Sequence, residues 1–178
     1  MVFGIVGKIG SGKSEIVKYF KDEYNAISFS CDEIAKKIIK DNGLKIYNSE
    51  EVFTNSNLQE KIRAELHPIV FQRINENINN FKNKSELFFI IESALPSDDM
   101  FSICDKMIYV DSPYDMRVSR LKSSRGYDEN KIKQIFNSQK YYDRFYDRAD
   151  IKIDNSGTID DLINRIKGVM NEIYIVGK

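Results

Sequence analysis

The sequence is poor in the residues that usually hold structural metals and disulfides, with two cysteines and a single histidine. Cys31 and Cys104 stand alone, without the C-x-x-C spacing or the neighbouring histidine of a zinc site. An isolated pair is also too small for a disulfide framework. We therefore expect both cysteines to be free thiols in the core.

Long apolar runs and an excess of positive charge are missing as well. The longest apolar stretches fall far short of the about 20 residues that cross a bilayer, and the N-terminal segment does not resemble a signal peptide. Lys and Arg number 27, as do Asp and Glu, so no net charge attracts nucleic acid, although local basic patches are compatible with this balance. We expect a cytoplasmic protein without membrane or nucleic-acid partners, and a small anionic substrate.

A glycine-rich segment near the start of the chain carries the clearest chemical signal. Residues 7–14 read GKIGSGKS and match G-x-x-x-x-G-K-[ST]. They follow an apolar run with Phe3, Ile5 and Val6, and they precede a helical pattern that begins near Lys13. In this setting, backbone N–H groups and the positive end of the helix converge on an anion. The sequence therefore predicts a nucleotide-binding phosphate loop.

The motif also assigns roles by position. Lys13 is expected to reach the β- and γ-phosphates of ATP, and the Ser14 hydroxyl is expected to coordinate Mg²⁺. The other predicted nucleotide-binding residues in this segment are Lys8, Ile9, Gly10, Ser11, Gly12 and Glu15.

Short apolar runs alternate with helical patterns along the rest of the chain. Strands predicted at 26–30, 87–91, 107–110 and 151–153 would join the first strand in a parallel sheet that is covered by helices on both faces. Helices are predicted at 13–20, 34–39, 58–81, 113–122, 128–145 and 158–174. Pro68 should kink the third helix or divide it, and Asn42-Gly43 should end the second. The pattern predicts one α/β domain over residues 1–178.

Two helical regions and one carboxylate complete the predicted kinase parts. Residues 32–82 are expected to bind the acceptor, and the helix–break–helix at 113–146 is a candidate lid that excludes water. Asp32 follows the second strand, at the sheet edge where open α/β folds bind ligands, and it could orient or deprotonate an acceptor hydroxyl. Capping of the next helix by Cys31-Asp32 is the structural alternative. Because no guanine-reading N-K-x-D segment occurs, a small-molecule kinase is favoured over a G-protein.

Segments along most of the chain resemble the dephospho-coenzyme A kinase family. Its first strand, loop and helix are matched by VFGIVGKIGSGKSEIVKYF, its acceptor-side aspartate by SCDEIAKKI, and its His-Pro element by ELHPIV. The strand before its lid, the return helix of the lid and its last strand are matched by DKMIYVDSP, QIFNSQ and ADIKIDNSGTIDDL. Many kinase families share the phosphate loop, whereas the occurrence of these elements in this order distinguishes this family from the others.

The resemblance implies a P-loop NTPase-type, three-layer α/β/α fold with a five-stranded parallel sheet. It implies transfer of the ATP γ-phosphoryl group to the ribose 3′-hydroxyl of dephospho-coenzyme A, with Mg²⁺, in the last step of coenzyme A biosynthesis. Asp32, Lys13 and Arg120 would be catalytic, and Arg117 would help Arg120 to neutralise charge. A solvated helix face is the alternative for both arginines.

Four more residues enter the predicted site through the resemblance. His67 would contact the acceptor, although a structural role beside the helix kink explains it as well. Glu92 stands where the family has an aspartate and would hold water on Mg²⁺. Asn155 and Gly157 would border the adenine, although a turn after the last strand also accounts for them.

The chain also departs from the family. The segment between Asp32 and His67 is shorter and lacks the usual Phe-Gly and Asp-Gly-x-Leu pieces, which weakens the prediction of the acceptor. A nucleoside or nucleotide kinase of the same architecture and a regulator that binds ATP without transferring phosphate therefore remain as alternatives. The individual positions that differ are Lys8, Glu15, Ser30, Glu92 and Arg125, which is displaced by one residue relative to Gln139.

Overall fold

A computed structural model describes residues 1–41, 55–81 and 87–176 of the chain. The predicted helix stop at Asn42-Gly43 lies outside the described residues, as do the other residues of 42–54 in the 32–82 region. Among the described helices, none is both long enough and apolar enough to cross a membrane.

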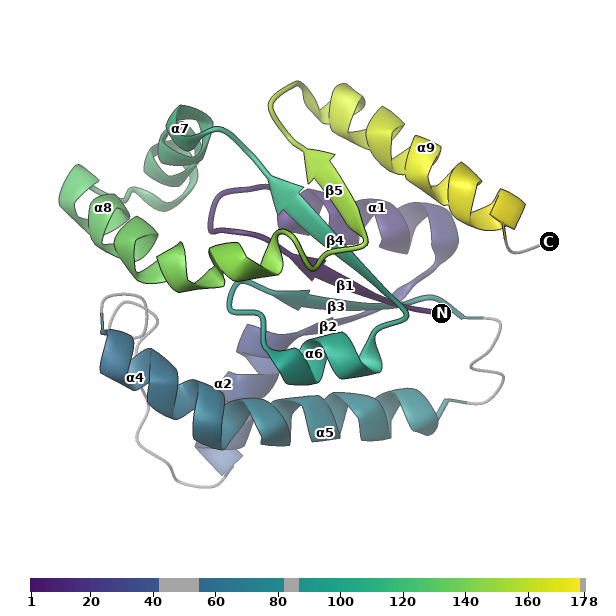
Figure 1. Cartoon of the computed structure of the whole chain (residues 1–178), viewed down its shortest axis with the longest axis horizontal. Coiled ribbons are helices and arrows are strands. Elements are labelled where there is room, and N and C mark those ends of the chain that lie inside the picture. Colours follow the sequence, from purple (N-terminus) through teal and green to yellow (C-terminus); the bar gives the residue numbers. More distant parts are fainter. Residues whose placement is uncertain (42–54, 82–86, 177–178) are drawn as a thin grey trace.

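A five-stranded parallel sheet forms the centre of the molecule (Figure 1). Its order is β2-β3-β1-β4-β5, so the strand before the phosphate loop lies in the middle. The predicted parallel α/β sheet is therefore confirmed, with strand bounds within a few residues of those expected. The strands are β1 (Val2–Val6), β2 (Ile27–Ser30), β3 (Phe89–Ser93), β4 (Lys106–Asp111) and β5 (Ile151–Asp154).

Helices cover both faces of the sheet, which gives three layers. Helices α1 (Lys13–Tyr24) and α9 (Ile159–Val176) pack on one face, where they meet residues such as Ile90 and Ile108. Helices α2 (Cys31–Asp41), α5 (His67–Asn79) and α6 (Asp98–Ile103) cover the other face (Figure 1). The first three residues of β3, Phe89, Ile90 and Ile91, are all apolar and at most 1% exposed, because they are covered by the cores on both faces of the sheet.

The predicted interruption at Pro68 is confirmed. Helix α4 (Ser56–Lys61) runs into a π-helical turn, η1 (Ile62–Leu66), and α5 begins at His67. Proline in the first turn of α5 has no N–H to donate to the preceding turn, so the wider turn lies where the regular bonding pattern is broken. The short helix α6 is a correction, since the sequence patterns did not predict it.

The predicted helix–break–helix after β4 is also present. Helix α7 (Tyr114–Arg125) ends at Gly126, which has φ of 64°, and Asp128 caps α8 (Glu129–Ser138) by accepting a hydrogen bond from Lys131 N at 2.8 Å. The helix expected at 128–145 is shorter than predicted, because Gln139–Phe145 forms a 3₁₀ segment, η3. These elements share a third apolar cluster with Ile9 of the phosphate loop.

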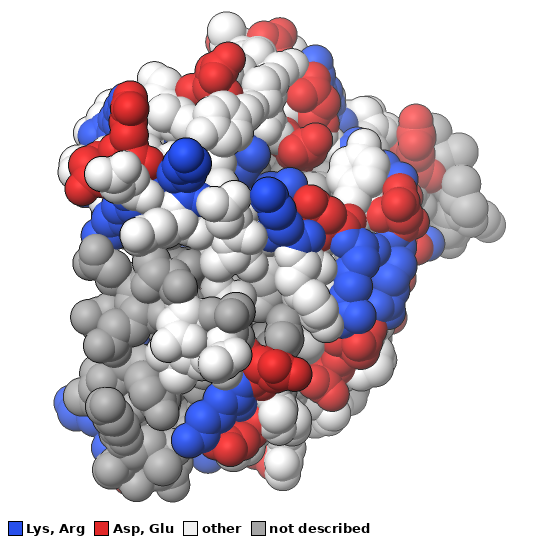
Figure 2. Space-filling model, turned by 60° about the vertical axis from the view of Figure 1, so that its left-hand side comes forward, with Lys and Arg blue, Asp and Glu red and all other residues white. Residues whose placement is uncertain are grey.

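Basic and acidic side chains are interspersed on the face shown in Figure 2. Both cysteines are free thiols, as expected: Cys31, the first residue of α2, is buried in the core, and Cys104, directly after α6, is partly buried against it. Burial raises the pKa of the Cys31 thiol above its usual range. The thiol is therefore protonated and unreactive at neutral pH.

Candidate active site

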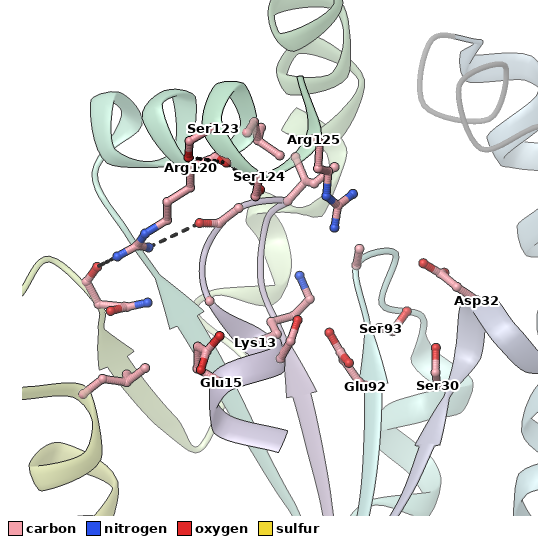
Figure 3. A pocket seen from close by; sticks show the side chains of 18 of the residues that line it. Lys13, Glu15, Ser30, Asp32, Glu92, Ser93, Arg120, Ser123, Ser124 and Arg125 are labelled. Carbon is pink, nitrogen blue, oxygen red and sulfur yellow. Dashed lines mark hydrogen bonds between the residues drawn. The ribbon is translucent and has the colours of Figure 1, made fainter. Parts of the chain in front are cut away.

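A cleft of about 600 Å³ opens at the carboxyl edge of the sheet. Its walls come from the phosphate loop, the start of α2, the end of β3, the last turns of α7 and the segment after β5 (Figure 3). The fold therefore gathers parts of the chain that are far apart in sequence. Of the residues predicted from sequence, those lining the cleft are Ile9, Gly10, Gly12, Lys13, Ser14, Glu15, Asp32, Glu92, Arg120, Asn155 and Gly157.

The phosphate loop owes its shape to glycines with positive φ. Gly10 and Gly12 have φ of 77° and 98°, which L side chains rarely adopt. A Cβ on Gly12 would lie 2.1 Å from Nδ2 of Asn155, which donates a hydrogen bond to Ser11 O at 2.8 Å. Asn155, predicted to border the adenine, thus also fixes the backbone of the loop.

The Lys13 side chain folds back over its own loop. Its ammonium donates to Gly7 O at 2.9 Å and to Lys8 O at 3.3 Å, and the residue is only 7% exposed. Burial lowers the pKa of Lys13 to about 8, and the charges of Glu92 and Asp32 act in the opposite direction. Lys13 therefore lies between the loop carbonyls and the acidic side of the cleft, where an anionic phosphate would strengthen its charged form.

Two carboxylates lie across the cleft from the phosphate loop, one on α2 and one on β3. Asp32 stands in the first turn of α2 and Glu92 near the end of β3 (Figure 3). Burial raises the pKa of Glu92, Lys13 opposes that shift, and Asp32 adds to it. The charges of these three groups therefore influence one another across the cleft.

The expected cap at Cys31-Asp32 is corrected by the structure. The oxygen that accepts from the helix start is Ser30 Oγ, 3.4 Å from Glu33 N. Both Cys31 and Asp32 lie within the first helical turn. Since Ser30 accepts this bond, the carboxylate of Asp32 stays available in the cleft.

Arg120 is held by acceptors from three parts of the chain. Its guanidinium donates to Gly10 O at 3.3 Å, Ser112 Oγ at 3.0 Å and Asn155 O at 3.2 Å. These bonds join the phosphate loop to the ends of β4 and β5. Arg120 thus lies on the Asn155 side of the cleft, away from Asp32 (Figure 3).

Arg125 is the functional candidate that the sequence analysis did not select. It lines the cleft at the end of α7 and points toward Lys13 (Figure 3). Its charge acts on the pKa of both Lys13 and Glu92. The signal that could have identified Arg125 was its position in the last turn of α7, directly before Gly126. It was set aside because it stands one residue from the family's lid arginine, which suggested that its side chain points elsewhere.

The remaining predicted residues do not line the cleft. Lys8 pairs with Asp143 of η3, and Ser11 is 1% exposed. His67 is buried, edge-on to Phe71 at 5.9 Å between ring centres. Arg117 is buried as well; its Nε donates to Ser112 O and its guanidinium lies 4.2 Å from the Phe136 ring centre. Cleft residues absent from the prediction include Glu33, Lys36, Ser93, Tyr127 and Ile159.

Comparisons with known proteins show which family the chain is similar to. A family model described as dephospho-CoA kinase matches residues 44–161. A relative from Fusobacterium nucleatum, named Dephospho-CoA kinase, is 27% identical over 190 residues, covering 94% of this chain and 95% of that protein. The crystal structure of TT1252 from Thermus thermophilus has a TM-score of 0.74 at 21% identity over 97% of each chain. Dephospho-CoA kinase from Campylobacter jejuni has a TM-score of 0.66 at 20% identity, covering 99% of this chain and 98% of its own.

Proposed function

The chain belongs to the dephospho-CoA kinase family, and we propose that it transfers the γ-phosphoryl group of ATP to the ribose 3′-hydroxyl of dephospho-CoA, giving CoA and ADP. The observation that carries this proposal is that the phosphate loop, Lys13 and Asp32 line the same cleft. Family membership favours this acceptor over the nucleosides and nucleotides that the sequence alone left open. A cytoplasmic location, where ATP is available, is part of the proposal.

The donor nucleotide would occupy the side of the cleft formed by the phosphate loop. Loop N–H groups and the Lys13 ammonium would bind its phosphates, since both are suited to a multiply charged anion. Asn155, Gly157 and Arg120 line the same side, so the base and ribose would lie beside them. Because Arg120 donates hydrogen bonds to Gly10 O and Asn155 O, it would fix the phosphate loop relative to the segment after β5.

Asp32 would act on the acceptor hydroxyl. An alcohol is too weak an acid to be ionised fully by a carboxylate, so Asp32 aligns the 3′-hydroxyl and takes its proton as the new bond forms. The ribose oxygen attacks the γ-phosphorus, the bond to the β,γ-bridging oxygen breaks, and its electron pair leaves with ADP. Lys13 and Arg125 would balance the charge on the transferring group, since both occupy the cleft near Glu92.

The side chains in the cleft fit a magnesium ion held mainly by the nucleotide. Ser14 of the phosphate loop and Asp32 and Glu92 of the acidic side offer oxygen donors to the cleft, the type of ligand that Mg²⁺ prefers. Within the described residues, no group of three or more His, Cys, Asp or Glu side chains could hold a metal, which suits an ion that keeps phosphate and water ligands. When bound, Mg²⁺ would neutralise phosphate charge, with Ser14 as a ligand and Glu92 holding its water.

The proposal is tested by ADP release from Mg-ATP with and without dephospho-CoA, with mass spectrometry of the product. We expect acceptor-dependent ADP and CoA in the wild type. The Asp32→Asn variant should bind ADP normally and lose at least about 100-fold in turnover, because only the proton acceptor has changed. ADP release that is independent of dephospho-CoA, or full turnover in the variant, would contradict the assignment.

A further inference from the structure

We propose that Lys8 is a positioning residue, which fixes the phosphate loop through its ion pair with Asp143 and does not bind the nucleotide phosphates itself. The inference rests on the proposed function only in assuming that the loop binds ATP or ADP. The position of Lys8 within the motif had suggested a direct role, by adding positive charge next to the phosphates.

The Lys8 side chain is directed toward η3. Its Nζ lies 2.5 Å from Oδ1 of Asp143, with the Lys8 side chain 24% exposed and that of Asp143 53% exposed. Lys8 is not among the residues that line the cleft. The loop residues that follow it, Ile9, Gly10 and Gly12, do line the cleft. In this arrangement, the cation of Lys8 is already engaged on the side of the loop that faces η3.

The backbone of Lys8 supports the residues that bind phosphate. Its carbonyl oxygen accepts from the Lys13 ammonium at 3.3 Å and from Ser11 N at 3.1 Å. The first bond holds the lysine expected to reach the β- and γ-phosphates, and the second closes the turn of the loop. A restraint on Lys8 is therefore transmitted directly to the position of Lys13 and to the curvature of the loop.

The neighbouring residue is attached to the same segment. Ile9 N donates to Oε1 of Gln139 at 3.0 Å, and Gln139 is fully buried. The Nε2 of Gln139 donates to Ala94 O at 3.3 Å, next to the end of β3. The Ile9 side chain, 3% exposed, packs in the apolar cluster with α7, α8 and η3. Residues 8 and 9 thus rest on η3 by one ionic, one hydrogen-bonded and one apolar contact.

Two readings of Lys8 predict opposite effects of changing its partner. If Lys8 positions the loop, Lys8→Gln and Asp143→Asn break the same contact and should weaken ADP binding equally. For a partly exposed pair, we expect about a 2- to 5-fold rise in Kd. If Lys8 instead binds phosphate, only Lys8→Gln should weaken ADP binding. Asp143→Asn would then free the lysine from its ion pair and leave the Kd for ADP unchanged or lower.

The experiment is calorimetric titration of Mg-ADP into the full chain and these variants, together with the charge-swapped double variant Lys8→Asp/Asp143→Lys. Positioning predicts that the swap restores Kd to within about 2-fold of the wild type, since the ion pair forms again with reversed polarity. A phosphate ligand cannot be replaced by a carboxylate, so a swap that binds as weakly as Lys8→Gln, or more weakly, would overturn the proposal. The control is Lys152→Gln, which breaks the surface pair of Lys152 with Asp147 at 3.7 Å and should leave Kd unchanged.

Kinetics add a readout that a purely structural defect would not produce. The Lys8→Gln and Asp143→Asn variants should raise KM for ATP with kcat near that of the wild type, and their thermal midpoints should match that of the control. A decrease in both kcat and the thermal midpoint would overturn the proposal in favour of a general folding role. Because ADP titration needs no acceptor, wild-type ADP binding without phosphorylation of dephospho-CoA would refute the proposed function alone, whereas wild-type protein that binds no ADP would refute both.

Discussion

Replacing Gly12 by alanine tests the structural account of the phosphate loop most sharply. The new Cβ would meet Nδ2 of Asn155 at 2.1 Å and its Cγ at 3.4 Å, at a residue whose φ is +98°. Asn155 is 5% exposed, and its amide donates to Ser11 O. The substitution therefore imposes backbone strain and forces a buried, hydrogen-bonded side chain to move.

The expected cost follows from these two effects. A non-glycine residue in the left-handed region costs about 1 kcal/mol, and breaking the buried Asn155 bond costs roughly 1–3 kcal/mol. Gly12→Ala should thus lose roughly 2–4 kcal/mol of unfolding free energy. For a chain of 178 residues this corresponds to a fall in Tm of roughly 4–16 °C. ADP binding should be lost as well, because the loop N–H groups are displaced.

Gly126→Ala provides the matched control. Gly126 also has positive φ, +64°, but no atom lies within 4 Å of an added Cβ. Only the backbone cost of about 1 kcal/mol applies, so Tm should fall by roughly 2–4 °C. Comparing the two variants by differential scanning calorimetry separates the steric contribution from the conformational one.

The double variant Gly12→Ala/Asn155→Ala completes the test. Both single changes break the Asn155–Ser11 bond, and the double variant has no amide left to collide with the new methyl group. Its loss should therefore be smaller than the sum of the single losses by about 1–2 kcal/mol. Strict additivity, or a Gly12→Ala variant no less stable than Gly126→Ala, would refute the reasoning.

Further predictions concern charged groups in the cleft. Burial lowers the pKa of Lys13 from 10.5 to about 8, so between these pH values the unfolded chain binds more protons than the folded protein. The unfolding free energy of the wild type, relative to Lys13→Met, should therefore increase as the pH rises from about 8 to 10.5. Denaturant unfolding of both proteins at about pH 7 and 9.5 measures this difference. A difference that stays constant or falls with pH would contradict the lowered pKa. Arg125→Ala should reduce kcat by about 100-fold with little change in the Kd of ADP, measured by steady-state kinetics and calorimetry. Arg120→Ala should mainly raise KM for ATP, since it loses bonds to Gly10 O and Asn155 O, and a pure kcat effect there would reverse the two assignments.

The most predictable parts of the molecule are those governed by local sequence. The loop motif and the break between the helices predicted at 113–122 and 128–145 depend on residues within a few positions of one another, and both are present in the structure. Helix α6 was missed because six residues carry too little periodicity to be distinguished from a loop. The cap of α2 was assigned to Cys31-Asp32 instead of Ser30, since neighbouring polar side chains compete for the same N–H groups.

By itself, the sequence determined the α/β class, the phosphate loop, the carboxylate at Asp32 and the resemblance to a kinase family, because motifs and hydrophobic periodicity are local properties. Tertiary structure alone decided which charges face one another. It directed Arg125 toward Lys13 and joined Arg120 to the ends of β4 and β5. It also paired Lys8 with Asp143. The Lys8–Asp143 pair joins residues more than a hundred positions apart, which no local pattern predicts. A rotation of one residue along a helix, about 100°, also changes which partner a side chain meets.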